Sequence, residues 1–149
     1  MAIEDFKIGD RFASPSKTLT DAHFLFFSGL TGDNHPIHYD VEYAKQKGFR
    51  GPLAHGLLLA SMTALGASPG SQIADGLVFV EQGCRFLRAA IPGDTIHPQL
   101  LVDKIWQDGP REFVRLITRI QNQRDETLLE GFHVYQKVQP KVAGKTESK

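Results

Sequence analysis

The sequence predicts a single α+β domain in which an antiparallel β-sheet wraps around a buried helix. Three observations support this prediction: residues 57–65 are almost entirely apolar, runs rich in β-branched and aromatic residues follow, and the links between those runs are short. A helix without a polar face belongs inside a core. Strands joined by short links are antiparallel, because a parallel crossover needs about a dozen residues. The predicted strands are 77–89, 95–106, 112–123 and 127–138.

Length and composition indicate one globular unit. The chain has 149 residues, of which 41% are hydrophobic and 23% charged, and a domain usually takes roughly 100–200 residues. These proportions are those of an ordinary folded protein and argue against disorder. The predicted domain covers residues 1–139, because the segment 140–149 is polar and follows the last strand. We expect that segment to be a flexible tail.

Two shorter helices are predicted before the buried one. Thr20 offers a side-chain oxygen as the cap of a helix that begins near Asp21. Its expected apolar face consists of Phe24, Phe27 and Leu30. Asp40 is the expected N-cap of the second helix. This helix is expected to end near Gly48, which can adopt the left-handed backbone conformation that closes a helix.

Charge and hydropathy exclude several classes of partner. Seventeen basic residues balance seventeen acidic ones, whereas nucleic-acid binding needs a cationic footprint. The first residues lack the pattern of a secretory signal, and no apolar run approaches the ~18 residues of a membrane span. We therefore expect an intracellular, cytoplasmic protein with neither nucleic acid nor membrane as partner. The single cysteine, Cys84, is expected to pack within a strand.

The segment 32–40 contains the residues most suited to catalysis. It reads Gly32-Asp33-Asn34-His35-Pro36-Ile37-His38-Tyr39-Asp40. Pro36 prevents a continuous helix and bends the chain, so Asp33 and His38 can reach a common point. An imidazole with an ordinary pKa near 6.5 exchanges protons near neutral pH, and a carboxylate can deprotonate water. Taken alone, however, the motif is better explained as loop structure beside an ordinary interior histidine.

A second element, Ala54-His55-Gly56, stands directly before the buried helix. The first N–H groups of a helix have no internal partner and carry a partial positive charge, which suits a carbonyl oxygen that becomes negative. Gly56 has no side chain to block such an approach. In isolation, a glycine that allows close packing of helix against sheet is the better explanation.

Together these segments resemble the MaoC-like dehydratase family, which includes the R-specific enoyl-CoA hydratases. The family motif reads approximately Gly-Asp-x-Asn-Pro-[Ile/Leu/Val]-His, and residues 32–38 match it. The resemblance also includes residues 6–12, 54–57, 60–61 and 92–95, and so covers nearly the whole chain except the tail. It implies a hotdog fold, an antiparallel sheet wrapped around a long central helix.

The resemblance also implies a role for each matching residue. Asp33 matches the catalytic aspartate and His38 the catalytic histidine. Gly56 matches the glycine whose N–H binds the thioester oxygen, and Ser61 matches the serine that supports the site from the helix. His55 is expected to be a further supporting residue.

The implied reaction is the reversible addition of water to a trans-2-enoyl-CoA, which gives a (3R)-hydroxyacyl-CoA. Asp33 would act as the base toward water, and His38 would donate a proton to the α carbon, while an amide at the helix start stabilises the thioester oxygen. The expected substrate is a thioester of coenzyme A or acyl carrier protein, with no metal and no cofactor. The resemblance further implies a homodimer, or a higher homo-oligomer, whose sheets join edge to edge with the site near the interface.

One residue departs from the family pattern, because His35 stands where asparagine is usual. We expect His35 to support the site but to reshape the acyl pocket or perturb its electrostatics.

Three alternatives to the hydratase function stay open. A cluster of carboxylate and imidazole groups could bind a metal; its members are Asp33, His35, His38, Asp40 and His55. The chain could instead bind acyl thioesters without turnover, or hydrolyse them as a hotdog thioesterase, because fold does not fix function.

Overall fold

The computed structural model describes residues 6–68 and 76–138. In chain order its elements are β1 (Arg11–Ala13), β2 (Lys17–Thr18), α1 (Asp21–Thr31), η2 (Pro36–His38), α2 (Val41–Gln46), α3 (Gly56–Ser61), η3 (Leu65–Ala67), β3 (Leu77–Phe86), β4 (Thr95–Asp108), β5 (Arg111–Gln121) and β6 (Thr127–Lys137). None of the helices in this part of the chain has the length and apolar character needed to cross a membrane. The tail predicted over 140–149 lies outside the described residues.

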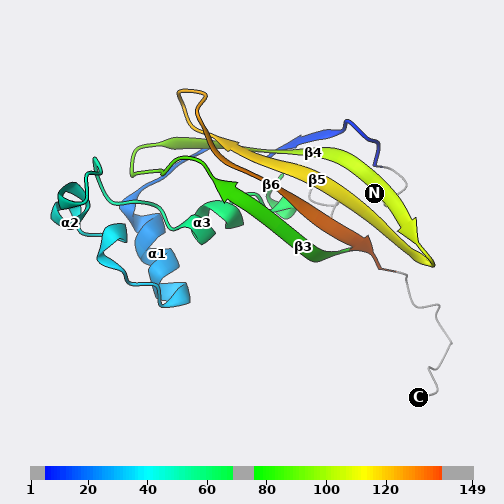
Figure 1. Ribbon diagram of the computed structural model, residues 1–149, viewed down its shortest axis with the longest axis horizontal. Coiled ribbons are helices and arrows are strands. Elements are labelled where there is room, and N and C mark those ends of the chain that lie inside the picture. Colours follow the sequence, from blue (N-terminus) through cyan, green and yellow to red (C-terminus); the bar gives the residue numbers. More distant parts are fainter. Residues whose placement is uncertain (1–5, 69–75, 139–149) are drawn as a thin grey trace, which may run out of the picture.

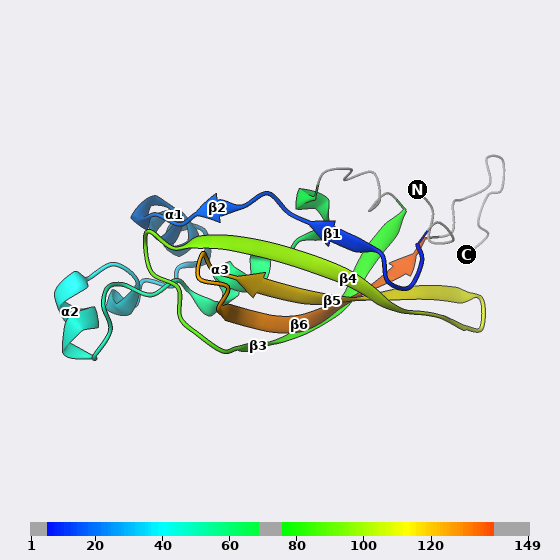
Figure 2. The same ribbon diagram turned by 90° about the horizontal axis from the view of Figure 1, so that it is seen from above.

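The strands form one antiparallel arrangement in the order β1-β4-β5-β6-β3, and β2 pairs with the start of β4 (Figures 1 and 2). Tight turns reverse the chain between the long strands, and Gly109 and Asp125 have left-handed φ values of 61° and 58° there. β3 lies at an edge and pairs only with β6 among the described strands. The predicted α+β class and the antiparallel connections are confirmed.

The core lies between the inner face of the sheet and the helices. Alternate residues of β5 are at most 1% exposed: Val114, Leu116, Thr118 and Ile120. Such alternation is typical of a sheet covered on one face. Leu58 and Leu59 of α3 pack in a cluster with Ile120, and full burial of each such side chain stabilises the fold by about 1.5–3 kcal/mol. The start of α3 lies beside the loop that follows α1, because Nε2 of His55 is 3.3 Å from the Asp33 carbonyl oxygen. Figure 1 shows α1, α2 and α3 gathered at one end of the sheet.

The central helix is shorter than predicted. α3 has six residues, Gly56–Ser61, and Met62 ends it, so the expectation of a long helix through residue 65 is wrong. The hydroxyl groups of Ser61 and Thr63 each donate to the carbonyl three residues earlier, at 2.6 Å. Such bonds offer the backbone an alternative to helical pairing, and the chain turns there instead of continuing.

The buried face of α1 also differs from the prediction. Phe24 and Ser28 are buried, whereas Leu30 is 73% exposed. Thr20 is the N-cap as expected, and its N–H donates to Nδ1 of His23 at 2.9 Å. A spacing of four residues therefore defines the contact face of this helix, and a polar residue occupies its second position.

Candidate active site

The loop between α1 and α2 is fixed at both ends. Gly32 ends α1 with a φ of 81°, and its N–H donates to the Ser28 carbonyl oxygen at 2.8 Å. Pro36 begins η2, where its fixed φ suits a helix start and its missing N–H has no partner to lose. The Leu53 N–H donates to the Ile37 carbonyl oxygen at 2.9 Å. The loop is thereby held against the segment that enters α3.

This loop brings Asp33 and His38 together. Oδ2 of Asp33 lies 3.6 Å from Nε2 of His38, and the two side chains are 52% and 12% exposed respectively. The imidazole is therefore packed into the protein while the carboxylate reaches solvent. Nδ1–H of His38 donates to the Leu53 carbonyl oxygen at 2.8 Å. Because a carbonyl only accepts, Nδ1 keeps its proton and Nε2 is the nitrogen that exchanges protons.

His55 lies behind this pair and contacts both of its members. Its ring stacks on the His38 ring, with centroids 3.7 Å apart and planes inclined by 18°. Nε2–H of His55 donates to the Asp33 carbonyl oxygen at 3.3 Å, and the same nitrogen lies 3.0 Å from Oγ of Ser28. A side chain that is 2% exposed thus contacts the loop that follows α1, the His38 ring and helix α1 itself.

The environment of His55 favours its neutral form. Desolvation by burial lowers the pKa of His55 most, and the nearby charge of His38 lowers it further, while the hydrogen bond to the Asp33 backbone opposes both effects. A neutral His55 allows His38 to carry a positive charge without a second cation stacked against it.

The cluster of Asp33, His38 and His55 lacks the geometry of a metal site. Their ligand atoms lie within 4.8 Å of one another, but the two rings are stacked and nearly parallel. The lone pairs of ring nitrogens lie in the ring planes, so the lone pairs of the two rings lie in nearly parallel, separate planes. Zinc would need them to converge at about 2.0–2.1 Å.

The other two candidate metal ligands are helix caps. Nδ1 of His35 accepts the Ile37 N–H at 3.1 Å and caps η2. An asparagine oxygen at this position would accept in the same way, so the departure from the family pattern preserves the local hydrogen bond. Oδ1 of Asp40 accepts the Tyr43 N–H at 3.0 Å and caps α2. His35 therefore lies beside the pair without joining it.

Gly56 is the first residue of α3. Its N–H makes no hydrogen bond to any residue that the structure describes, as is normal at a helix start. A Cβ at this position would meet the ring of Phe86 at 3.2–3.4 Å. A side chain here would press on that ring, so glycine permits the close packing of α3 against β3.

Ser61 is not brought to the pair. Its hydroxyl donates to the Leu58 carbonyl oxygen at 2.6 Å. The residue lines a different cavity, of about 340 Å³, together with Phe79, Gln82 and His133. No hydrogen bond joins Ser61 to the site loop within the described ranges, so its expected supporting role stays a prediction.

A cavity of about 630 Å³ opens beside His38. Leu25 and Val41 supply apolar surface to its wall, and Arg50 supplies a cation. Ligand sites for small molecules usually have volumes of about 300–1,000 Å³ with a few polar groups in an apolar wall. His38 therefore borders a space that can hold a substrate.

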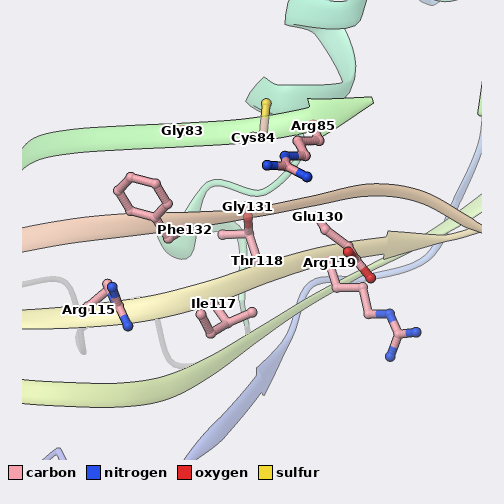
Figure 3. A pocket seen from close by; sticks show the side chains of 10 residues that line it. All are labelled: Gly83, Cys84, Arg85, Arg115, Ile117, Thr118, Arg119, Glu130, Gly131 and Phe132. Atoms are coloured by element: carbon pink, nitrogen blue, oxygen red, sulfur yellow. The ribbon is translucent and has the colours of Figure 1, made fainter. Parts of the chain in front are cut away.

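A slightly larger hollow lies on the outer face of the sheet (Figure 3). Its volume is about 700 Å³, and its wall includes Arg85, Ile117 and Phe132 from three neighbouring strands. None of the predicted site residues lines it. The candidate chemistry is thus confined to the helical end of the molecule.

Sequence reasoning missed three contributors to the site. Ser28 contacts His55, the Phe27 ring lies 4.8 Å from the His55 ring, and the Leu53 carbonyl fixes His38. A buried serine four residues after Phe24 is a weak sign of a polar contact beneath the helix. The other two depend on tertiary packing and leave no mark in the local sequence.

An open antiparallel sheet with a helix packed against its inner face is the hotdog architecture (Figure 2). The chain belongs to the family described as MaoC like domain, which matches residues 5–115. The (R)-specific enoyl-CoA hydratase of Aeromonas caviae is 30% identical over 123 residues, which are 80% of this chain and 87% of that protein. The predicted family and fold are confirmed.

Other relatives are matched over smaller shares of their length. The (R)-specific enoyl-CoA hydratase of Rhodospirillum rubrum is 33% identical over 94 residues, 62% of this chain and 63% of that protein. Enoyl-CoA hydratase ChsH3 of Mycobacterium tuberculosis is 35% identical over 82 residues, 55% of this chain and 27% of that protein. The chain thus matches less than two thirds of each of these two relatives.

Solved structures support the same fold. The A. caviae (R)-hydratase superposes with a TM-score of 0.80 at 26% identity, covering 91% of this chain and 99% of that one. The MaoC-like dehydratase from R. rubrum gives a TM-score of 0.82 at 26% identity, covering 95% and 99%. The likeness therefore extends over the whole described domain.

Proposed function

We propose that the chain is a hydro-lyase that reversibly adds water to a trans-2-enoyl-CoA and forms a (3R)-hydroxyacyl-CoA. The observation that carries the proposal is the 3.6 Å gap between Oδ2 of Asp33 and Nε2 of His38, with Nδ1 of His38 bound to the Leu53 carbonyl. The gap is long for a direct hydrogen bond, and a water molecule can bridge two polar groups at such a separation. The site can therefore hold a nucleophilic water between a base and an acid.

The proton transfers follow from this arrangement. Asp33 takes a proton from the water as the oxygen bonds to the β carbon of the enoyl group. Nε2–H of protonated His38 gives its proton to the α carbon, and transfer of the first proton from Asp33 to His38 restores the starting state. In the reverse direction the two residues exchange roles, so hydration and dehydration use one site.

The remaining site residues have subsidiary roles in this proposal. The free N–H of Gly56 binds the thioester oxygen, on which negative charge develops during water addition. His55 positions His38 and the Asp33 backbone through its stack and its hydrogen bond. His35 keeps η2 in place as its cap, and Ser61 contributes to the wall of the neighbouring cavity.

The proposed assembly is a homodimer joined through the β3 edge. Val78, Phe79 and Val80 of this edge strand are 46–49% exposed, and Leu57 of α3 is 69% exposed. An unpaired apolar edge promotes association, and a second copy of the chain would cover it. Such a partner would also close the site region near the start of α3. Sedimentation at micromolar concentration tests this, and a monomer would contradict it.

The decisive test is hydration of crotonyl-CoA, followed through the loss of its conjugated-enoyl absorbance. Asp33→Asn and His38→Gln should each lower kcat by about 10²–10⁴-fold, which is the usual contribution of general acid–base catalysis. Free thiol released without hydroxyacyl product would indicate a thioesterase, and binding without either product would indicate a non-catalytic subunit. Full activity in both variants would also refute the proposal.

A further inference from the structure

Three arginines from separate segments line a cavity of about 390 Å³ at the helical end of the sheet: Arg50, Arg88 and Arg124. Arg50 also lines the cavity of about 630 Å³ beside His38. Arg50 therefore borders both cavities, and its guanidinium group links the neighbourhood of His38 to the other two arginines.

Backbone hydrogen bonds hold these segments side by side. The Ala54 N–H donates to the Ala90 carbonyl oxygen at 2.8 Å, which places the segment after Arg50 against the segment after β3. The Leu87 N–H donates to the Leu128 carbonyl oxygen at 2.8 Å, which joins that segment to the start of β6. The convergence of the arginines is thus built into the fold.

One carboxylate fixes two of the three arginines. Oε2 of Glu126 accepts from Arg88 at 2.9 Å, and Oε1 accepts from Nε of Arg124 at 2.6 Å. Arg124 also lies 3.8 Å from Asp94. Arg50 has no ion-pair partner within residues 6–68 and 76–138. The cavity wall therefore keeps an excess of positive charge, and its uncompensated cation is the one shared with the active-site cavity.

We propose that Arg50, together with Arg88 and Arg124, binds the phosphate groups of the coenzyme A nucleotide. The proposal rests on the hydratase function and names coenzyme A, not acyl carrier protein, as the acyl carrier. Guanidinium groups bind phosphate oxygens through paired N–H donors. Coenzyme A carries a 3′-phosphate and a diphosphate, so a concave site with several arginines suits it better than the single phosphodiester of a carrier protein's prosthetic group.

The first test is binding of adenosine 3′,5′-bisphosphate by calorimetry, which needs no turnover. Arg50→Gln should weaken binding by about tenfold or more, because hydrogen bonds between charged groups are worth that much in affinity. Arg85→Gln is the matched control: it removes the same charge from the outer hollow, where Arg85 also has no ion-pair partner among described residues, and it should change affinity less than twofold. Arg88→Gln should weaken binding as well.

The second test compares crotonyl-CoA with crotonyl-pantetheine, which lacks the nucleotide. Arg50→Gln should raise KM for crotonyl-CoA about tenfold and should lower kcat/KM for crotonyl-pantetheine by much less, because that substrate lacks the nucleotide phosphates. Equal loss in the Arg50 and Arg85 variants, or bisphosphate binding that no arginine variant affects, would overturn the phosphate site. An inactive wild type that still binds bisphosphate through Arg50 would refute the hydratase function and leave the phosphate site standing.

Discussion

Two hollows of similar volume, one beside His38 and one on the outer face of the sheet, differ in how their polar groups are held. In the outer hollow Arg115 pairs with Asp103 at 2.6 Å, and this hydrogen bond raises the pKa of Arg115. Both partners lie on adjacent strands and are partly exposed. Beside His38, the imidazole is bound to the carbonyl of Leu53 and stacked on a fully buried ring.

This difference shows that rigid support, not volume, identifies the candidate site. Two hydrogen bonds hold the Arg115–Asp103 pair, but they join only neighbouring strands at a partly exposed surface. A side chain held by buried contacts from several segments keeps one orientation, which proton transfer requires. The larger hollow is a feature of the sheet surface, whereas the smaller cavity is lined by a histidine that its neighbours hold in one orientation.

The largest difference in kcat is expected between two variants that each remove one polar group, one in the cavity beside His38 and one in the outer hollow. His38→Gln should lower kcat for crotonyl-CoA by about 10²–10⁴-fold with little change in KM, because the proton donor is lost. Arg115→Gln should leave kcat within twofold and change the melting temperature only slightly. Steady-state kinetics of both variants check this. Comparable losses of kcat would mean that the outer hollow takes part in catalysis.

Two glycines, Gly83 and Gly131, line the outer hollow. Replacing them should give the next largest effect, a loss of folding stability. A Cβ at Gly131 would collide with the carbonyl oxygen of Gly83 and with Cys84 on the adjacent strand. Backbone cannot yield as a flexible side chain can, so Gly131→Ala should reduce the free energy of unfolding by about 3 kcal/mol. Gly83→Ala should reduce the free energy of unfolding by less, because the nearest atoms to its Cβ belong to the Phe132 side chain, which can rotate away. Urea unfolding measures both, and equal losses would contradict the argument.

Residue patterns predict the sheet well because its determinants are local. Short polar links force antiparallel neighbours, and alternation in β5 marks the buried face. The length of α3 could not be predicted from hydropathy, since the hydroxyl of Thr63 bonds backwards to the chain and the helix ends despite an apolar sequence. Leu30 lies on the exposed side of α1 for a related reason: packing on His55 decides which face is buried.

The candidate site is predictable only in part. Pro36 bends the loop, and this local effect is enough to suggest that Asp33 and His38 meet. The supports of His38 are not local, because the Leu53 carbonyl and the His55 ring reach it from 15 and 17 residues away in the sequence. Only the folded chain reveals which histidine lies beside Asp33 and which is the buried ring stacked behind it.

A third prediction concerns a histidine buried away from both hollows. Burial lowers the pKa of His133 from 6.5 to about 4, and its Nε2 lies 3.1 Å from Oγ1 of Thr63. The folded state binds a proton on His133 more weakly than the unfolded state does. This residue therefore does not lower the free energy of unfolding above pH 6.5, but it lowers it progressively as the pH falls from 6.5 toward 4. The decrease in the free energy of unfolding that is due to His133 should reach about 3 kcal/mol near pH 4.

Urea unfolding at pH 7 and pH 4.5 tests this, with His133→Gln as the comparison. The variant should be less stable than wild type at pH 7 because its contact with Thr63 is altered, and the difference should shrink at the lower pH. A constant difference between the two proteins at both pH values would show that His133 is not the titrating group.

The smallest expected effect tests the support of His38. His55→Phe keeps an aromatic ring in the stack but removes the hydrogen bond to the Asp33 carbonyl. We expect kcat to fall about tenfold with KM unchanged, since a modest displacement of the loop weakens proton transfer more than binding. His55→Gln restores a donor and should recover part of kcat, although it lacks the ring. If both variants lose kcat only in proportion to a lower melting temperature, His55 is structural, and the orientation of His38 must then come from the Leu53 carbonyl alone.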